Sequence, residues 1–212
     1  MIKPMLDESP SPSTRSPEAA PELVGEFVVL RPMTVEDAAI THQWRLGARA
    51  RLLNGAAASV EDQRRWISQR PRGEFNYIIQ LIGGPPVGML SLIDIDLVNR
   101  RAESARFLIG DEAAAKGAPA AVEAMKLLYE LAFDRLGLER VYGVIEQRNH
   151  LMIKWQKYLG MQEEGRLRRH YLKDGEFMDA ISLGLLAGEY RAQTLPRMTA
   201  LLAMGRRRSA GE

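Results

Sequence analysis

The chain has 212 residues, of which 46% are hydrophobic and 26% are charged, and it contains no cysteine. This length suits one domain with appended segments, and the missing thiols exclude disulfides, thiolate metal sites and cysteine nucleophiles. No run approaches the roughly 20 apolar residues of a membrane span, and the three scattered histidines lack the spacing of metal ligands. With no signal peptide at its start, the sequence predicts a cytoplasmic, metal-free protein.

The distribution of charge argues against nucleic acid as a partner. The net charge is +2 at pH 7, and the 22 basic and 21 acidic side chains between residues 25 and 188 nearly cancel. A domain that binds nucleic acid usually carries a basic field on its folded body. We therefore expect a small-molecule partner.

The first segment, residues 1–24, contains five prolines among Ser, Thr and Glu and few large apolar side chains. Such a segment cannot bury enough surface to offset its ordering entropy. The pattern predicts a disordered leader or a pairing arm. The folded domain, 25–188, should begin near Gly25 with a strand at 26–31 that ends at Pro32.

Two capped helices and three strands are expected next. Thr34 and Ser59 each precede an acidic residue by three positions, which is the spacing of a helix cap. Strands are expected at 75–82, 87–96 and 101–109, and the Gly-Gly-Pro-Pro turn joins the first two as a hairpin.

From Gly117 to Leu136, apolar side chains recur every three or four residues, which predicts a long amphipathic helix. The domain is completed by a strand at 139–146, a helix from Asn149 to 159, and a hairpin of strands 161–172 and 176–186. The element order β-α-α-β-β-β-α-β-α-β-β predicts an α+β fold, with a mixed, mostly antiparallel central sheet flanked by helices.

Residues 189–212 form a basic extension that carries five arginines. Its segment 195–204 is amphipathic, but it is too short and too moderately apolar for membrane contact. We expect it to dock on the domain or on a second subunit, which leaves a homodimer open.

A small-residue loop before the long helix is a candidate phosphate site. Its amides can approach a phosphate, and the helix dipole favours negative charge, although Gly117 could equally serve only to start the helix. The GxGxxG and P-loop patterns are absent, so the standard dinucleotide and nucleotide sites are excluded.

Two blocks of the chain resemble the GCN5-related N-acetyltransferase (GNAT) family. The first is 102–111 with 116–118, and the second is 149–165, where several identities stand at fixed spacing. The resemblance covers about residues 25–190. Trp44-Arg45 and the stretch 91–96 resemble the amino-sugar nucleotide branch more than the ribosomal-protein alanine branch.

The resemblance implies that acetyl-CoA lies in a V-shaped opening between strands 101–109 and 140–146. One strand edge would pair with the pantetheine arm, an N–H near Leu108 would polarise the thioester carbonyl, and the loop amides would hold the pyrophosphate. Asn149 would touch the pantetheine or order the splayed strands. The cofactor-binding residues implied are Phe107, Leu108, Ile109, Lys116, Gly117, Ala118, Pro119, Ala120 and Asn149.

The implied reaction is direct attack of a neutral primary amine on the thioester, which a base and an acid assist. Glu103 is the candidate base because it lies on the strand beside the opening, and a solvated strand face is the alternative. Tyr142 or Tyr171 would supply the acid. The candidate acceptor-binding residues are Trp44, Arg45, Asp94 and Arg169, with core packing as the alternative for Trp44 and a solvated strand face for Arg169.

Three positions depart from the family pattern. Ala114 stands where members often have Arg or Gln, Pro119 has no N–H to offer a phosphate, and Gln156 replaces a frequent acidic tyrosine. These departures leave open a non-catalytic binding or scaffold protein. For an enzyme, the favoured acceptor is an amino-sugar nucleotide, with a narrow and partly basic cleft. The alternative is a protein N-terminus or another amine, and a protein acceptor would need a wide, acidic cleft.

Overall fold

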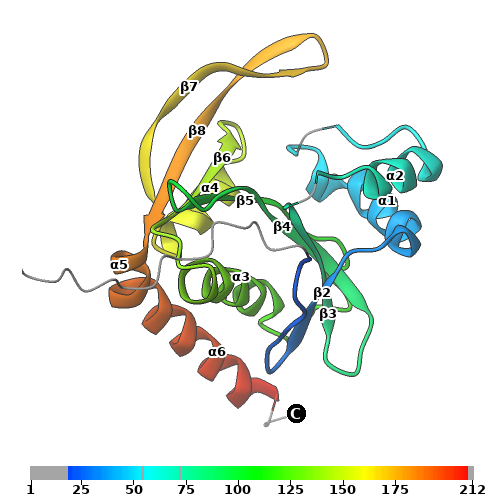
Figure 1. The fold of residues 1–212 in the computed structure, drawn as a ribbon. Helices are drawn as coiled ribbons and strands as arrows, with labels where there is room; N and C mark the ends of the chain where they lie inside the picture. Colours follow the sequence, from blue (N-terminus) through cyan, green and yellow to red (C-terminus); the bar gives the residue numbers. More distant parts are fainter. Residues whose placement is uncertain (1–18, 54, 72, 210–212) are drawn as a thin grey trace, which may run out of the picture.

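The computed structural model describes residues 19–53, 55–71 and 73–209. Its centre is one eight-stranded sheet in the order β1-β2-β3-β4-β5-β6-β8-β7, with helices on both faces (Figure 1). Neighbouring strands pair antiparallel except for β5 and β6, which are parallel. The predicted α+β class with a mostly antiparallel sheet is therefore confirmed. The strands are β1 (Leu23–Val24), β2 (Val28–Pro32), β3 (Phe75–Leu81), β4 (Pro86–Asp96), β5 (Arg101–Ile109), β6 (Arg140–Glu146), β7 (Gln162–Lys173) and β8 (Glu176–Leu186).

The helices follow the predicted order. They are α1 (Ala38–Leu46), α2 (Val60–Ser68), α3 (Ala120–Glu130), α4 (His150–Tyr158), α5 (Ala187–Glu189) and α6 (Leu195–Ser209). The long helix begins at Ala120 rather than at Gly117 because Pro119 is its N-cap, and a π-helical turn at Leu131–Arg135 extends it. In the described ranges, no helix is long and apolar enough to cross a membrane.

The sheet starts earlier in the chain than expected. β1 pairs with β2, and the Leu23 side chain is buried in the core. The last two residues of the segment predicted as a leader are therefore part of the sheet, while residues 1–18 lie outside the described part of the chain. Short 3-10 helices, Val35–Asp37 and Ala48–Ala50, flank α1 and were also not expected.

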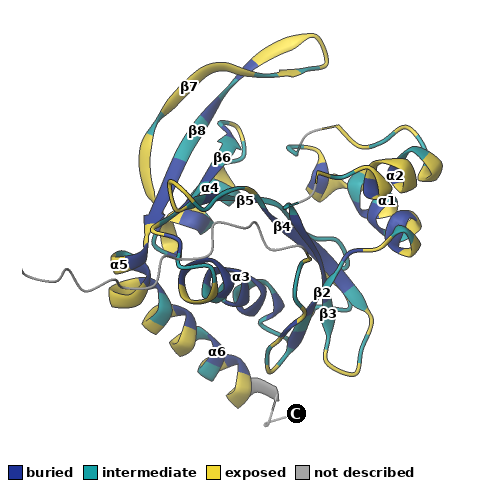
Figure 2. Ribbon diagram, viewed as in Figure 1, coloured by how far each residue is buried: buried dark blue, intermediate teal, exposed yellow. Residues whose placement is uncertain are grey.

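Side chains alternate between the two faces of the sheet, as strand geometry requires, and form two apolar clusters. On β3, Tyr77 and Ile79 pack in the larger cluster with α3 and α6, whereas Ile78 packs with α1 and α2. Figure 2 shows the inward faces of α3 and α6 buried. Met198 of α6 is fully buried in the larger cluster, so the basic extension docks on the domain itself.

One buried carboxylate joins α3 to the start of the sheet. Glu123 accepts backbone hydrogen bonds from Glu26, Phe27 and Val28 at 2.8, 2.6 and 2.7 Å. A Cβ on Gly25 would collide with this carboxylate, so a side chain there would displace the Glu123 carboxylate from its position. Glu123 thus fixes where β2 enters the sheet.

We expect Glu123→Ala to lower the free energy of unfolding by about 2–4 kcal/mol, because backbone amides lose a charged acceptor. Urea denaturation measures this change. Glu61→Ala is the control, since Glu61 is exposed and pairs with Arg64 on α2, and it should leave the urea midpoint unchanged. Equal midpoints for the two variants would contradict the assigned role of Glu123.

Candidate functional site

The parallel strands β5 and β6 remain paired over only three residues each. Arg101–Glu103 faces Arg140–Tyr142, and beyond these positions no described residue of β5 pairs with β6. The two strands diverge from this point. The V-shaped opening predicted from the sequence is therefore present.

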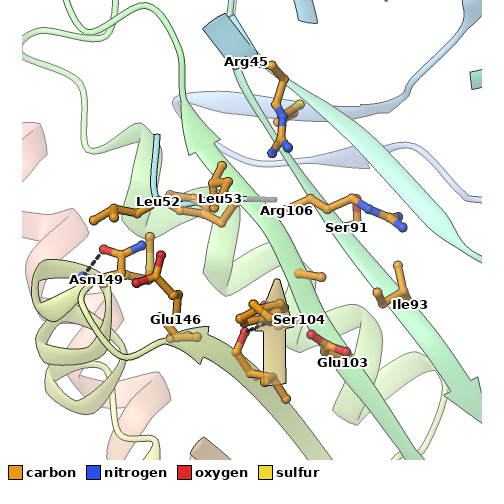
Figure 3. A pocket seen from close by; sticks show the side chains of 18 of the residues that line it. Arg45, Leu52, Leu53, Ser91, Ile93, Glu103, Ser104, Arg106, Glu146 and Asn149 are labelled. Carbon is orange, nitrogen blue, oxygen red and sulfur yellow. Dashed lines mark hydrogen bonds between the residues drawn. The ribbon is translucent and has the colours of Figure 1, made fainter. Parts of the chain in front are cut away.

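A cleft of about 770 Å³ occupies this opening and extends across the sheet to α1 and α2. In Figure 3, Arg45 points into the cleft from α1, while Glu103 and Ser104 of β5 and Glu146 of β6 lie on its opposite side. Asn149, at the start of α4, closes one end. The cleft is thus built by side chains from elements far apart in the sequence.

Two β-bulges shape the wall that β5 and β4 provide. Between Ala105 and Leu108, β5 holds one residue more than β4 opposite it, and Arg106 has a φ of +56°. A bulge bends a strand and re-aims its side chains. A second bulge, on β4, contains Asp94, with a φ of +50°.

Glu103 lies where the two strands separate. Its carboxylate accepts a hydrogen bond from the backbone N–H of Val144, but burial and the nearby charge of Asp94 raise the pKa of Glu103 above its ordinary value. A carboxylate with a raised pKa in a cleft is a candidate general base. The location predicted for Glu103, on a strand and beside the opening, is observed.

Two tyrosines lie beside Glu103. The Tyr171 hydroxyl donates to the carbonyl of Val144 at 3.0 Å, and burial raises its pKa to about 12. The Tyr142 hydroxyl donates to Asp94, and burial together with that bond raises its pKa to about 12. Both phenols therefore stay protonated at neutral pH.

The β7–β8 hairpin arches over the cleft towards α1 and α2 (Figure 1). At its tip, Lys173 donates to the backbone carbonyls of Arg51 and Leu53, which follow α1. A register shift between Leu167 and Tyr171 bends β7, and His170 and Tyr171 line the cleft. The hairpin therefore bridges the cleft from one wall to the other.

The residue that replaces the frequent family tyrosine also lines the cleft. Gln156 is buried on α4, and its Oε1 accepts a hydrogen bond from Tyr129 at 3.3 Å. One residue before it, Trp155 stacks on Phe107 with ring centroids 4.9 Å apart. This stacking holds α4 against β5 at the open end of the V.

In the loop before α3, two of the predicted phosphate-binding amides are already paired, since Lys116 donates to the carbonyl of Ala113 at 3.3 Å and Ala118 to that of Ala115 at 3.2 Å. Gly117 has a φ of +89°, open space where a Cβ would stand, and, in the described part of the chain, no hydrogen-bond partner for its N–H. The amides of Ala120 and Ala121 lie in the first helical turn, which leaves its N–H groups unpaired. Pro119 packs against Gly205 of α6, so its ring is turned towards that helix.

Three of the four predicted acceptor residues, Trp44, Asp94 and Arg169, do not line the cleft. Trp44 is buried against Gly110 in the smaller apolar cluster. Neighbouring positions on a helix are about 100° apart, so Arg45 reaches the cleft where Trp44 does not. Arg169 lies on the outer part of β7 with its guanidinium over Phe177. The Leu108 side chain packs with Trp44 and Met89, and Asp94 reaches the cleft only through Tyr142.

Several lining residues were not predicted. They are Ser91, Ile93, Ser104, Arg106, Trp66, Glu146 and His170. Glu146 is buried and forms an ion pair with Arg148, and its position at the end of a predicted strand was a signal that could have been used. Arg106 could not be found in this way, because its orientation depends on the bulge. Among the described residues, no group of three or more acidic or histidine side chains could hold a metal ion.

The comparisons with known proteins agree on one family. The model of the Acetyltransferase (GNAT) domain matches residues 28–162. Spermidine N(1)-acetyltransferase of Escherichia coli is 30% identical over 110 residues, which cover 52% of this chain and 58% of that protein. The match thus spans little more than half the length of this curated relative.

Solved structures share the fold. A GCN5-related N-acetyltransferase from Brucella melitensis superposes with a TM-score of 0.76 and 21% identity, over 89% of this chain and 87% of that one. A spermidine N-acetyltransferase chimera from Vibrio cholerae and hSSAT gives a TM-score of 0.68 and 19% identity, over 79% and 100%. At these identities the likeness concerns the fold alone.

We expect Glu103→Gln to stabilise the protein at neutral pH. The raised pKa of Glu103 means that its ionised form opposes folding, and the amide removes this charge while it can still accept the bond from Val144. The gain should vanish as the pH falls below the ordinary glutamate value of 4.5, where the carboxyl is protonated in both states. Urea midpoints measured across this range test the sign.

Glu164→Gln is the control of opposite sign. Its ion pair with Arg140 lowers the pKa of Glu164, so this substitution should destabilise the protein at neutral pH and have no effect in acid. A Glu103→Gln variant that behaves in the same way would contradict the assigned environment of Glu103.

Proposed function

The chain belongs to the GNAT acetyltransferase family, and from this premise we propose that it transfers an acetyl group from acetyl-CoA to a primary amine. The observation that carries the proposal is the divergence of β5 and β6 directly after Glu103 and Tyr142. It leaves a free strand edge and a half-buried carboxylate at the same place.

The opening suits an extended thioester carrier. The edge of β5 at Phe107, Leu108 and Ile109 has no β6 partner, so it can pair with the amides of a pantetheine arm as a neighbouring strand would. In the loop before α3, the amides of Gly117 and Ala120 can hold a pyrophosphate together with the α3 dipole, whereas those of Lys116 and Ala118 donate to carbonyls within the loop. Pro119 offers no N–H, and its contact with Gly205 turns its ring away from this task.

In the proposed reaction, acetyl-CoA supplies an activated acyl carbon. Glu103, directly or through one water, takes a proton from the acceptor amine as its nitrogen bonds to that carbon. The N–H near Leu108 stabilises the negative charge that develops on the carbonyl oxygen. As the carbon–sulfur bond breaks, Tyr171 or Tyr142 returns a proton to the thiolate.

The tyrosines are suited to this role by their protonation. Each has a pKa of about 12, so each carries its proton at neutral pH, whereas Gln156 has no acidic proton. The Tyr171 hydroxyl is held by the carbonyl of Val144, and the Tyr142 hydroxyl is held by Asp94. These bonds fix their positions beside Glu103.

Two classes of acceptor are candidates. The first is an amino-sugar nucleotide, which the sequence of α1 and of the stretch 91–96 favours, since Ser91 and Ile93 of that stretch line the cleft. The second is a polyamine, because the relative from Escherichia coli is a spermidine acetyltransferase and because Glu103 and Glu146 both face the cleft. A panel of amines decides between them.

We expect thiol release from acetyl-CoA in the presence of an amine acceptor, and a fall in kcat of about 100-fold for Glu103→Gln, as loss of a general base produces. The panel should contain an amino-sugar nucleotide, spermidine and a peptide with a free N-terminus. Glu163→Gln, on the exposed side of β7, is the control and should keep the wild-type kcat. Acceptor-independent thiol release at one slow rate would instead support a non-catalytic binding protein.

Gly117→Asp should abolish acetyl-CoA binding, because it places a carboxylate against the pyrophosphate. Gly83→Asp is a matched control: Gly83 also has a positive φ and open space around it, but it lies in the β3–β4 turn. Both substitutions strain the backbone alike, so isothermal titration should separate them by affinity alone. Equal affinities would show that this loop does not hold the pyrophosphate.

A further inference from the structure

Gln156 brings a buried amide to the wall of the cleft. The residue lies on α4 and lines the cleft, yet only 4% of it is exposed. The ring of its neighbour Trp155 stacks on Phe107 of β5, so α4 packs against the strand edge along which the pantetheine arm is proposed to lie. Gln156 therefore stands beside the proposed path of the thioester carrier.

The oxygen of this amide is held from behind by a fixed donor. Oε1 of Gln156 accepts a hydrogen bond from the Tyr129 hydroxyl at 3.3 Å. Tyr129 is fully buried, and its ring contacts those of Phe133 and Tyr190, with centroids 6.0 Å apart in each pair. Burial raises the pKa of Tyr129, so its hydroxyl keeps its proton and acts as the donor.

The nitrogen of the same amide is left for the cleft. Nitrogen and oxygen point in different directions from the amide carbon, so fixing Oε1 on Tyr129 also fixes the direction of Nε2. Within the described ranges Nε2 has no hydrogen-bond partner, and it is not one of the fully buried unpaired atoms, which belong to Tyr77, Tyr190 and Thr194. The amide of Gln156 therefore offers two N–H donors to whatever occupies the cleft.

We propose that Gln156 is a catalytic residue that donates a hydrogen bond to the sulfur of the bound thioester carrier and stabilises the thiolate as it leaves. This inference rests on the proposed acetyl transfer and deepens it at the same site. Tyr129 is the positioning residue, because its hydroxyl holds the amide with the N–H groups towards the cleft. A donor that is in place before the charge develops needs no reorganisation during the reaction.

Gln156 keeps both of its amide protons throughout the step. As the acceptor nitrogen bonds to the acyl carbon, the carbon–sulfur bond breaks and its electron pair moves onto the sulfur. The amide N–H donates to this negative sulfur, and a hydrogen bond to a charged acceptor is stronger than one to a neutral acceptor. The proton that completes the thiol comes from Tyr171 or Tyr142, whose hydroxyls carry one at neutral pH.

The first test is the pKa of the coenzyme A thiol when it is bound, measured from the ultraviolet absorbance of the thiolate. Coenzyme A has the sulfur but no acetyl oxygen, so this pKa reports donors to the sulfur alone. We expect Gln156→Leu to raise it by about 1, because a hydrogen bond to the charged form lowers a pKa, and Tyr129→Phe to raise it by less. Glu103, Glu146 and His170 also line the cleft, and they remain in every variant, so the difference reports the amide.

Tyr77→Phe is the matched control for Tyr129→Phe. Tyr77 is also fully buried, but it does not line the cleft, and in the described part of the chain its hydroxyl has no hydrogen-bond partner. Its loss should leave the thiol pKa at the wild-type value. Isothermal titration with coenzyme A identifies the variants that fold, and if Gln156→Leu does not, Tyr129→Phe removes a single oxygen atom and still decides. A wild-type thiol pKa in either variant that binds coenzyme A would overturn the role of Gln156.

The second test separates this inference from the proposed function. With an amine that the wild type acetylates, Gln156→Leu should lower kcat at least about 10-fold, as loss of a preorganised donor does, and should leave the KM for the amine unchanged. Unchanged kcat and thiol pKa would make Gln156 structural, while acetyl transfer stands. If no amine is acetylated but the thiol pKa shifts as expected, the proposed function fails and the sulfur contact stands. If coenzyme A does not bind, both fail.

Discussion

The early end of the parallel pairing between β5 and β6 is the constraint on which the whole site depends. Exposed backbone groups at such a break need other partners, because an unpaired buried N–H or C=O is costly. Here side chains provide them: Val144 donates its N–H to Glu103 and accepts a hydrogen bond from the Tyr171 hydroxyl. The same two side chains that keep the strands apart are therefore the candidate base and acid, and both lie at the apex of the opening.

This arrangement explains why the candidate base, Glu103, is half-buried without being neutralised by an ion pair. Glu103 receives one backbone bond and faces the charge of Asp94, whose own hydrogen bonds go to Tyr142 and Arg101. A direct cation would lower the pKa of Glu103 and make it a weaker base. The environment that makes the Glu103 carboxylate more basic thus also lowers the free energy of unfolding, as is common at functional sites.

The sequence was sufficient to predict most of the helices and strands, but not the side-chain orientations that form the cleft. Ser59 and Asn149 cap α2 and α4 as their spacing predicted, and Asp174-Gly175, both with positive φ, form the expected tight hairpin turn. These features depend on neighbours within a few residues. The bulge at Arg106 depends on the register of β4 against β5, which no local pattern records, and so Arg106 and its partner Glu74 were missed. Trp44 and Arg45 show the same limit, since only the packing of α1 on Gly110 decides which of the two faces the cleft.

The charge composition of the chain does not reveal that acidic and basic side chains are separated along the cleft. The basic and acidic side chains of the domain nearly cancel in number, which argued for a small-molecule partner but carried no information on its charge. In space they are separated: Glu103 and Glu146 line the cleft beside the diverging strands, while Arg45 and Arg106 line it near Trp66. Because an electrostatic interaction weakens with distance and with water between the charges, each end can act on its own part of a ligand.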